Sequence, residues 1–257
     1  MLPLFFEGEF TVPRRVALIT DTSLHLGPDL ARILAKRDHD LILGNPLPGL
    51  VAEVEALGAS VVALDGMEDL GDGHNIARLI DAGLQRFARL DAACVRTGVI
   101  IGGAFLEATL DQLQTLQRAN QEAVFHTLQA LMGVMVPTGQ GQILIITSAT
   151  GKRLMPNSSL YSATRAGANM MVKAAAMEVA DKGVSINALG TAFLDYPGFI
   201  KATGSDDPEV RKKVEGMVPM KRFGQPAEIA HFAAGLLDGG NQFQTGQFFS
   251  MSGGWSD

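Results

Sequence analysis

GQILIITSATGKRLMPNSSLYSATRAGANMMVKAAAMEVADKGVSINALG, residues 141–190, contains a complete strand–helix–strand unit. Its strands are predicted at 142–147 and 184–189, and a helical pattern fills 158–182 between them. Both strand runs are apolar without alternation, which is typical of strands buried on both faces of a parallel sheet. Two parallel strands joined by a helix form a right-handed crossover, so this stretch indicates an α/β fold.

The same alternation continues on both sides of this unit. We expect one α/β domain over 15–257, with a doubly wound sheet of about seven mostly parallel strands and helices on both faces. An eight-stranded α/β barrel would need one more unit than the chain provides. Residues 1–14 are expected to form an extension that packs on the surface or on a partner subunit. The remaining strands are predicted at 16–20, 40–44, 60–64, 91–95 and 246–250, and the remaining helices near 27–37, 49–57, 73–88, 109–136 and 225–238.

Composition limits what this domain can do. Of the 257 residues in the whole chain, 47% are hydrophobic and 19% are charged, which suits one large core and argues against disorder. The net charge is −6 and no run of Lys or Arg occurs, so no nucleic-acid partner is expected. The single Cys94 and the five His show no metal-ligand spacing. No apolar run reaches the ~18 residues of a membrane span, and a cytoplasmic location is expected.

Three side chains near the middle of the chain form a reactive group. Ser148 follows the strand predicted at 142–147, at the sheet edge where α/β proteins bind ligands. Tyr161 and Arg165 lie one turn apart on one face of the next helix. A cation beside a phenol favours the phenolate, which can remove or return a proton, whereas Arg165 keeps its own proton. A strand-end Ser or a helical Tyr–Arg pair alone is more often structural, and the three together favour catalysis.

Two further features stand near this group in the predicted fold. Residues 191–206 show no helix or strand pattern, and a loop after the carboxyl end of a strand is a common ligand site. Trp255 is expected to be a packing residue, with a contribution to a pocket as the rarer role.

With these residues in place, nearly the whole chain resembles the short-chain dehydrogenase/reductase family. That family has a serine thirteen residues before a Tyr-x-x-x-Lys, and this chain has Ser148 followed by YSATR at 161–165. Asn120 matches the helix asparagine of the family, TGQFFSMSGG at 245–254 resembles its last strand, and Asp65 also fits a family position. The resemblance implies a Rossmann-like fold, in agreement with the predicted sheet.

The chain departs from the family where a nicotinamide cofactor would bind. The family's phosphate loop is Thr-Gly-x-x-x-Gly-x-Gly, whereas residues 20–27 read TDTSLHLG, so Asp21 and His25 replace glycines. Those glycines let backbone N–H groups approach a pyrophosphate, which Asp21 would repel. The second strand ends in Gly-Asn-Pro without an acid for a ribose, and the family's Asn-Asn-Ala-Gly is VRTG at 95–98. Because Arg165 also stands in place of the family's lysine, we expect no cofactor.

One branch of the family, the halohydrin dehalogenases, combines these losses. The chain is similar to it in ITSAT at 146–150, LYSATRAGA at 160–168 and PMKRFGQPAEIAHFAAGL at 219–236. The resemblance implies that the triad converts vicinal haloalcohols into epoxides without a cofactor, and opens epoxides with azide, cyanide, nitrite or halide. It also implies a halide site at Thr191, Phe193, Leu194 and His25, with an ordinary packed or partly exposed side chain as the alternative for His25. Thr150, Met155 and Pro156 lie between the serine and the tyrosine, so we expect them to line the substrate pocket together with Ala192, an ordinary surface loop being the alternative.

The helix predicted at 158–182 is small or apolar on nearly every face. Such a helix is buried on both sides, by the sheet and by either a partner subunit or a covering loop. The partner is favoured, and the resemblance implies a homotetramer built on 109–136 and 158–182. Two alternative functions remain. One is a divergent NAD(P)-dependent reductase, supported by Asp65 and Asn120, and the other is a non-catalytic ligand sensor.

Overall fold

The structure, a computed structural model, describes residues 14–256 of the chain. Within them, seven strands form one sheet in the order β3-β2-β1-β4-β5-β6-β7, and all neighbouring strands are parallel. The predicted parallel sheet is therefore confirmed. The predicted extension 1–14 lies outside the described residues except for Arg14. The strands are β1 (Arg15–Ile19), β2 (His39–Gly44), β3 (Val61–Leu64), β4 (Ala92–Arg96), β5 (Gly141–Ser148), β6 (Val184–Thr191) and β7 (Phe248–Met251).

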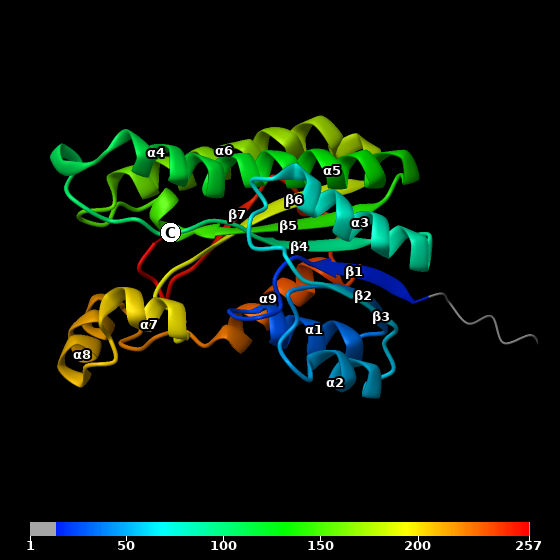
Figure 1. The fold of residues 1–257 in the computed structure, drawn as a ribbon, viewed down its shortest axis with the longest axis horizontal. Coiled ribbons are helices and arrows are strands. Elements are labelled where there is room, and N and C mark those ends of the chain that lie inside the picture. Colours follow the sequence, from blue (N-terminus) through cyan, green and yellow to red (C-terminus); the bar gives the residue numbers. More distant parts are fainter. Residues whose placement is uncertain (1–13, 257) are drawn as a thin grey trace, which may run out of the picture.

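Helices cover both faces of the sheet (Figure 1). Each face has its own apolar core, because the side chains of a buried strand point alternately to the two faces. Burying one large aliphatic side chain stabilises the fold by about 1.5–3 kcal/mol, so the cores hold the strand ends firmly. One face carries α1 (Gly27–Lys36), α2 (Leu50–Ala56) and α9 (Pro226–Leu237), and the other α3 (Gly73–Phe87), α4 (Leu110–Gln117), α5 (Ala123–Thr138) and α6 (Ser159–Val179).

Two segments differ from the sequence-based expectation. The helix predicted over 109–136 is interrupted by a π-helical turn at Arg118–Glu122, which separates α4 from α5. Segment 191–206, predicted to be an extended loop, contains the short helix α7 (Pro197–Thr203), and α8 (Pro208–Met217) follows it. Both short helices begin with a proline, which suits the first turn of a helix. Neither helix has a buried residue, so neither carries the apolar stripe by which a sequence reveals a helix.

The carboxyl ends of the strands share one edge of the sheet, and the strand order reverses between β1 and β4. Ligands of open α/β sheets bind in the crevice outside such a reversal. At the same edge, Ser148 at the end of β5 pairs in register with Thr191 at the end of β6. The predicted catalytic serine and the predicted halide loop are therefore neighbours, and α7 and α8 project beyond them (Figure 1).

Candidate active site

Ser148 is the last residue of β5, and its hydroxyl is held by three contacts. It shares a hydrogen bond with the Thr150 hydroxyl at 2.8 Å, accepts the Thr150 N–H at 3.2 Å, and reaches the Thr191 carbonyl at 3.4 Å. Thr150, predicted to line the substrate pocket, is buried against Ser148. The turn after β5 and the end of β6 together fix the serine oxygen at the sheet edge.

Tyr161 and Arg165 lie on the same side of α6, as their spacing predicts. Both side chains are buried, and the guanidinium carbon of Arg165 is 5.4 Å from the centroid of the Tyr161 ring. The chain passes from Ser148 to this helix through a tight turn at Ala149–Gly151. A Cβ on Gly151 would lie 2.8 Å from the backbone carbon of Arg165, so glycine lets the turn pack directly on α6. Close packing thus holds the turn after Ser148 against the helix that carries Tyr161 and Arg165.

Arg165 is anchored from the end of β4. Its guanidinium donates to the Thr97 hydroxyl at 3.2 Å and to the Thr97 carbonyl at 2.8 Å. Gly98, with a φ of +96°, leaves room for the guanidinium, because a Cβ there would lie 2.2 Å from Arg165 Nη2 and 2.1 Å from Asn120 Oδ1. The Arg165 guanidinium beside Tyr161 is therefore positioned by its hydrogen bonds to the uncharged Thr97, in space that Gly98 leaves open.

Asn120 lies in the π-helical turn between α4 and α5 and is fully buried. Its Oδ1 accepts the Val99 N–H at 3.1 Å, and its Nδ2 donates to the Thr164 hydroxyl at 3.0 Å. The side chain ties the segment after β4 to α6 beside Arg165, so it supports the geometry of the site.

His25 closes the site from the side of β1. Its backbone is left-handed, with a φ of +58°, and its buried ring lies with Nε2 3.5 Å from the Thr191 hydroxyl. The ring meets that of Tyr196 edge-on at 5.0 Å, and its Nδ1 has no partner among the described residues. Burial, aided by the charges of Arg96 and Arg165, lowers the pKa of His25 to about 3. The imidazole is therefore neutral at physiological pH.

Two residues of the site, Tyr196 and Arg96, were not predicted. Burial raises the pKa of the Tyr196 phenol, the charges of Arg96 and Arg165 oppose that rise, and the Tyr161 phenol adds to it. Arg96 also hydrogen-bonds the Tyr196 side chain, and Arg165 and Tyr161 lie near enough to act on its phenol. Arg96 ends β4 and Tyr196 follows β6, so a position at the carboxyl end of a strand was the signal that could have found them.

The loop between β1 and α1 does not fit a pyrophosphate. The Asp21 carboxylate accepts from the N–H and hydroxyl of Ser23 at 3.0 and 2.6 Å. The Gly27 N–H donates to the Leu24 carbonyl, and Pro28 has no N–H to offer. A pyrophosphate at the start of a helix needs such N–H groups free and no carboxylate beside them. The residues present therefore do not suit the dinucleotide that this fold usually binds.

An ion pair spans the crevice where the strand order reverses. Arg96, at the end of β4, donates from Nη1 to the Asp21 carboxylate, just after β1, at 2.7 Å. Thr22 then uses its N–H and its hydroxyl on the Gly44 carbonyl, at 2.8 and 2.9 Å, which fastens the loop to the end of β2. The crevice that holds a cofactor in doubly wound sheets is thus bridged by the chain's own side chains.

The predicted halide loop has an unusual backbone at Phe193. Its φ is +54°, and its carbonyl accepts the Gly224 N–H at 2.9 Å. Within residues 14–256, the N–H groups of Phe193 and Leu194 have no acceptor. Consecutive N–H groups next to a left-handed residue form a concavity suited to an anion.

The Phe193 side chain belongs to a small aromatic cluster. Its ring lies 6.0 Å from the Phe199 ring and 5.3 Å from the Trp255 ring, both edge-on. Met155, predicted for the substrate pocket, packs against this cluster, whereas Pro156 is exposed. Trp255 is buried in its own chain, in the packing role that the sequence favours.

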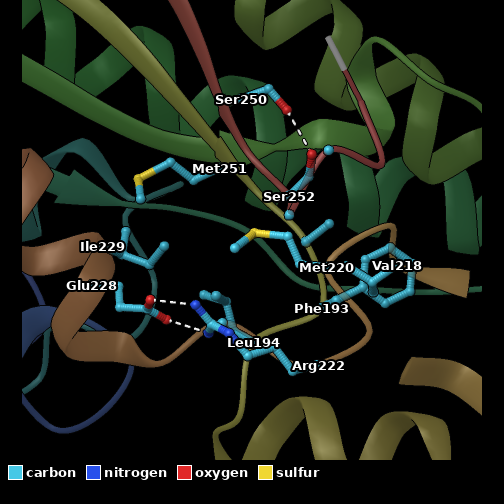
Figure 2. Close-up of a pocket in the computed structure, with 14 residues that line it drawn as sticks. Phe193, Leu194, Val218, Met220, Arg222, Glu228, Ile229, Ser250, Met251 and Ser252 are labelled. Carbon is cyan, nitrogen blue, oxygen red and sulfur yellow. Dashed lines mark hydrogen bonds and ion pairs between the residues drawn. The ribbon is translucent and has the colours of Figure 1, made fainter. Parts of the chain in front are cut away.

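A cavity of about 300 Å³ lies behind this loop (Figure 2). Ala192, Phe193 and Leu194 contribute to its wall, and an ion pair between Arg222 and Glu228 at 2.7 Å forms one side. Ser148, Tyr161, Arg165 and His25 do not line it. Of the four predicted substrate-pocket residues, Ala192 lines this cavity and Thr150 contacts Ser148, whereas the other two lie elsewhere.

Within the part of the chain that the structure describes, no group of three or more His, Cys, Asp or Glu side chains is placed to hold a metal ion. No helix in that part combines the length and the apolar character needed to cross a membrane. Cys94 is buried in β4, and burial raises the pKa of its thiol to about 12, which suits a packing residue.

Comparison with known proteins identifies relatives over almost the full length. A family model described as enoyl-(acyl carrier protein) reductase matches residues 26–256. The 2,5-dichloro-2,5-cyclohexadiene-1,4-diol dehydrogenase LinX of Sphingobium indicum is 29% identical over 246 residues, covering 94% of this chain and 96% of that protein. The 3-oxoacyl-acyl-carrier-protein reductase of Synechocystis sp. is also 29% identical, covering 93% of this chain and 96% of its own.

Solved structures agree with this assignment of the fold. Levodione reductase superposes with a TM-score of 0.84 at 25% identity, over 93% of this chain and 96% of its own. ElxO with NADP bound has a TM-score of 0.83 at 24% identity, over 94% of this chain and 98% of its own, a likeness that shows the shared fold.

Proposed function

Because this chain belongs to the short-chain dehydrogenase/reductase family but bridges its own nucleotide crevice, we propose that it works without a nucleotide, converting vicinal haloalcohols into epoxides and opening epoxides with small anions. The observation that carries the proposal is the ion pair between Asp21 and Arg96 across the strand-order reversal. It argues against hydride transfer from a nucleotide, while Ser148, Tyr161 and Arg165 support proton transfer.

In the proposed reaction, Ser148 and Tyr161 bind the hydroxyl of the haloalcohol. Tyr161 removes the hydroxyl proton, the alkoxide oxygen forms a bond to the neighbouring carbon, and the halide leaves with the electrons of the carbon–halogen bond. Tyr161 then passes its proton to water, so the products are an epoxide, a halide ion and a proton. Arg165 remains charged and stabilises negative charge on the phenol oxygen. Displacement within one molecule depends on positioning, which the buried triad supplies.

The proposed halide contacts are the N–H groups of Phe193 and Leu194. Support comes from their lack of acceptors among the described residues and from the left-handed backbone at Phe193. Thr191 and His25, 3.5 Å apart, adjoin this loop from the side of Ser148. A neutral His25 brings no competing anion and no fixed charge to the site.

A divergent NAD(P)-dependent dehydrogenase or reductase is the second candidate. The relatives reported above are dehydrogenases and reductases by name, and Ser148 and Tyr161 would serve such a reaction as well. The loop argues against it, because a nucleotide would have to separate Asp21 from Arg96 and release the N–H groups that the loop already uses.

The proposal is tested by incubating purified protein with several aliphatic and aromatic vicinal haloalcohols and no nucleotide. Release of halide and protons is expected, and azide is expected to open the corresponding epoxides. Failure of every haloalcohol to release halide, together with no azide opening, would overturn the proposal. Quenching of NADPH fluorescence on titration with the protein would instead favour the second candidate.

We also propose that subunits associate through α5 and α6, as the resemblance implies. Phe125 on α5 and Met170 and Met177 on α6 are 48%, 63% and 70% exposed. The two methionines are seven residues apart and share one face of α6, and grouped exposed apolar side chains indicate an interaction site. Met177→Glu should shift the assembly to smaller species in light scattering, and Leu106→Glu, on an exposed leucine outside α5 and α6, should not. An unchanged tetramer in Met177→Glu would contradict this interface.

A further inference from the structure

The guanidinium of Arg96 is a second cation in the site, and the proposed reaction does not use it. Arg96 occupies a position where the family resemblance has asparagine. One of its nitrogens binds Asp21 at 2.7 Å, and its side chain is 29% exposed, so part of it reaches solvent. A guanidinium carries five N–H donors, so its contacts with one Asp21 oxygen and with the Tyr196 side chain leave others for a ligand.

His25 and Tyr196 connect Arg96 to the triad. Their rings meet edge-on at 5.0 Å, with an angle of 82° between them. Beyond the larger effect of burial, the charges of Arg96 and Arg165 lower the pKa of both rings, and Arg96 also hydrogen-bonds the Tyr196 side chain. The two rings therefore lie in the field of two guanidinium groups, and His25 Nδ1 is more than nine-tenths buried without a partner.

The charges in this part of the site do not cancel. Arg96 and Arg165 bring two positive charges and Asp21 brings one negative charge, which leaves an excess of one positive charge. Among residues 14–256, the hydrogen bonds of the Arg165 guanidinium go to the uncharged Thr97, and His25 is neutral. A small anion beside a half-buried guanidinium gains charge-assisted hydrogen bonds and neutralises this excess.

We propose that Arg96 adds a charged contact to the small anion of the reaction, the departing halide or the incoming azide, cyanide or nitrite, on the side of the His25–Tyr196 pair, and so supplements the N–H groups of Phe193 and Leu194 proposed above. Asp21 orients the guanidinium and, by its own negative charge, weakens the hold on the anion so that halide can leave. The role of this anion in catalysis rests on the proposed function. Its place rests on the ion pair and the ring contacts.

The test is anion binding to the folded protein without any organic substrate. Line broadening of the chloride-35 NMR signal reports exchange of chloride at the site, and added azide or bromide should reverse the broadening. Arg96→Gln should weaken chloride and azide binding about tenfold or more, because a charge-assisted hydrogen bond is lost. The matched control is Arg118→Gln, which removes the same charge from an exposed pair with Asp69 at 2.8 Å and should bind as the wild type does.

A second variant keeps the test decisive if Arg96→Gln folds poorly. Asp21→Asn leaves Arg96 in place, removes the opposing charge, and should tighten anion binding severalfold. Wild-type protein that does not broaden the signal, or variants at Arg96 and Asp21 that bind as the wild type does, would overturn the inference. Anion binding that depends on Arg96 in a protein that releases no halide from haloalcohols would leave this site standing and remove the proposed reaction. If Arg96→Gln opens epoxides with an unchanged KM for azide, the proposed reaction stands and the anion site at Arg96 is overturned.

Discussion

Two regions of the molecule share one scaffold, in which a strand end leads through a turn into a helix. They are the crevice beside β1 and β2 and the site beside β5 and α6, and they differ in what their polar side chains bind. In the crevice, Asp21 and Thr22 bind groups of their own chain and Arg96 bridges the gap. Beside β5, Ser148 and Tyr161 are held by neighbours that leave the phenol beside a fixed charge. The two regions lie on either side of the point where the strand order reverses between β1 and β4. The crevice can therefore be closed by side chains of its own chain while the geometry beside β5 is kept.

The largest effect is expected from Tyr161→Phe, which changes the site beside β5 and α6 and leaves the crevice beside β1 and β2 unchanged. Removing the phenol hydroxyl deletes the group that takes the proton, so halide release should fall by about 10²–10⁴-fold. Stability and anion binding should change little, because the ring and Arg96 remain. A variant that keeps nearly all of its halide release would contradict the role of Tyr161.

Arg165→Lys introduces the lysine that the short-chain dehydrogenase/reductase family has at this position. It changes the site beside α6 and leaves the crevice beside β1 and β2 unchanged, so it separates the two regions. Halide release should drop by about 10–100-fold, since an ammonium cannot reproduce the two guanidinium contacts to Thr97. NADPH should still fail to bind, because Asp21 and the loop at 20–27 are unchanged. NADPH binding in this variant, measured by fluorescence, would contradict the claim that the loop excludes the nucleotide.

Gly98→Ala tests the packing that holds the catalytic charge. The new methyl group would meet Arg165 and Asn120 at 2.2 and 2.1 Å, at a φ of +96°. Urea unfolding should show a loss of about 2–4 kcal/mol, together with reduced halide release. The control is Gly216→Ala in α8, where nothing lies within 4 Å, and its stability should stay level or rise. Equal stabilities of the two variants would contradict this packing.

The smallest effect concerns how the free energy of unfolding depends on pH through His25, which lies in the loop between β1 and α1. Burial lowers the pKa of His25 to about 3, whereas the unfolded chain titrates near about 6.5. As the pH falls below about 6.5, the unfolded state binds a proton first, so stability is lost progressively toward about pH 3. Burial lowers the pKa of His39 in the same direction. His25→Gln should therefore lose stability less steeply between about pH 6 and 4 in urea unfolding, and an unchanged slope would contradict a neutral buried His25.

Much of this molecule could be predicted from local patterns. Most strands were predicted because they are apolar and buried on both faces, and the triad was predicted because Tyr161 and Arg165 are one turn apart. The ion pair of Asp21 with Arg96 joins residues 75 apart in the sequence, and no local pattern reveals such a contact. The helices α7 and α8 were missed because neither has a buried residue and so neither shows an apolar stripe. Thr150 gave no sign that its hydroxyl supports Ser148, since that depends on how the turn packs.

One measurement tests most directly whether this site moves a proton and releases an anion without a nucleotide. Protein freed of nucleotide is given a vicinal bromoalcohol, and bromide, protons and epoxide are followed in one sample, with and without added NADPH. The account predicts one bromide and one proton for each epoxide, at the same rate in both samples. No bromide release, together with binding of NADPH, would contradict it.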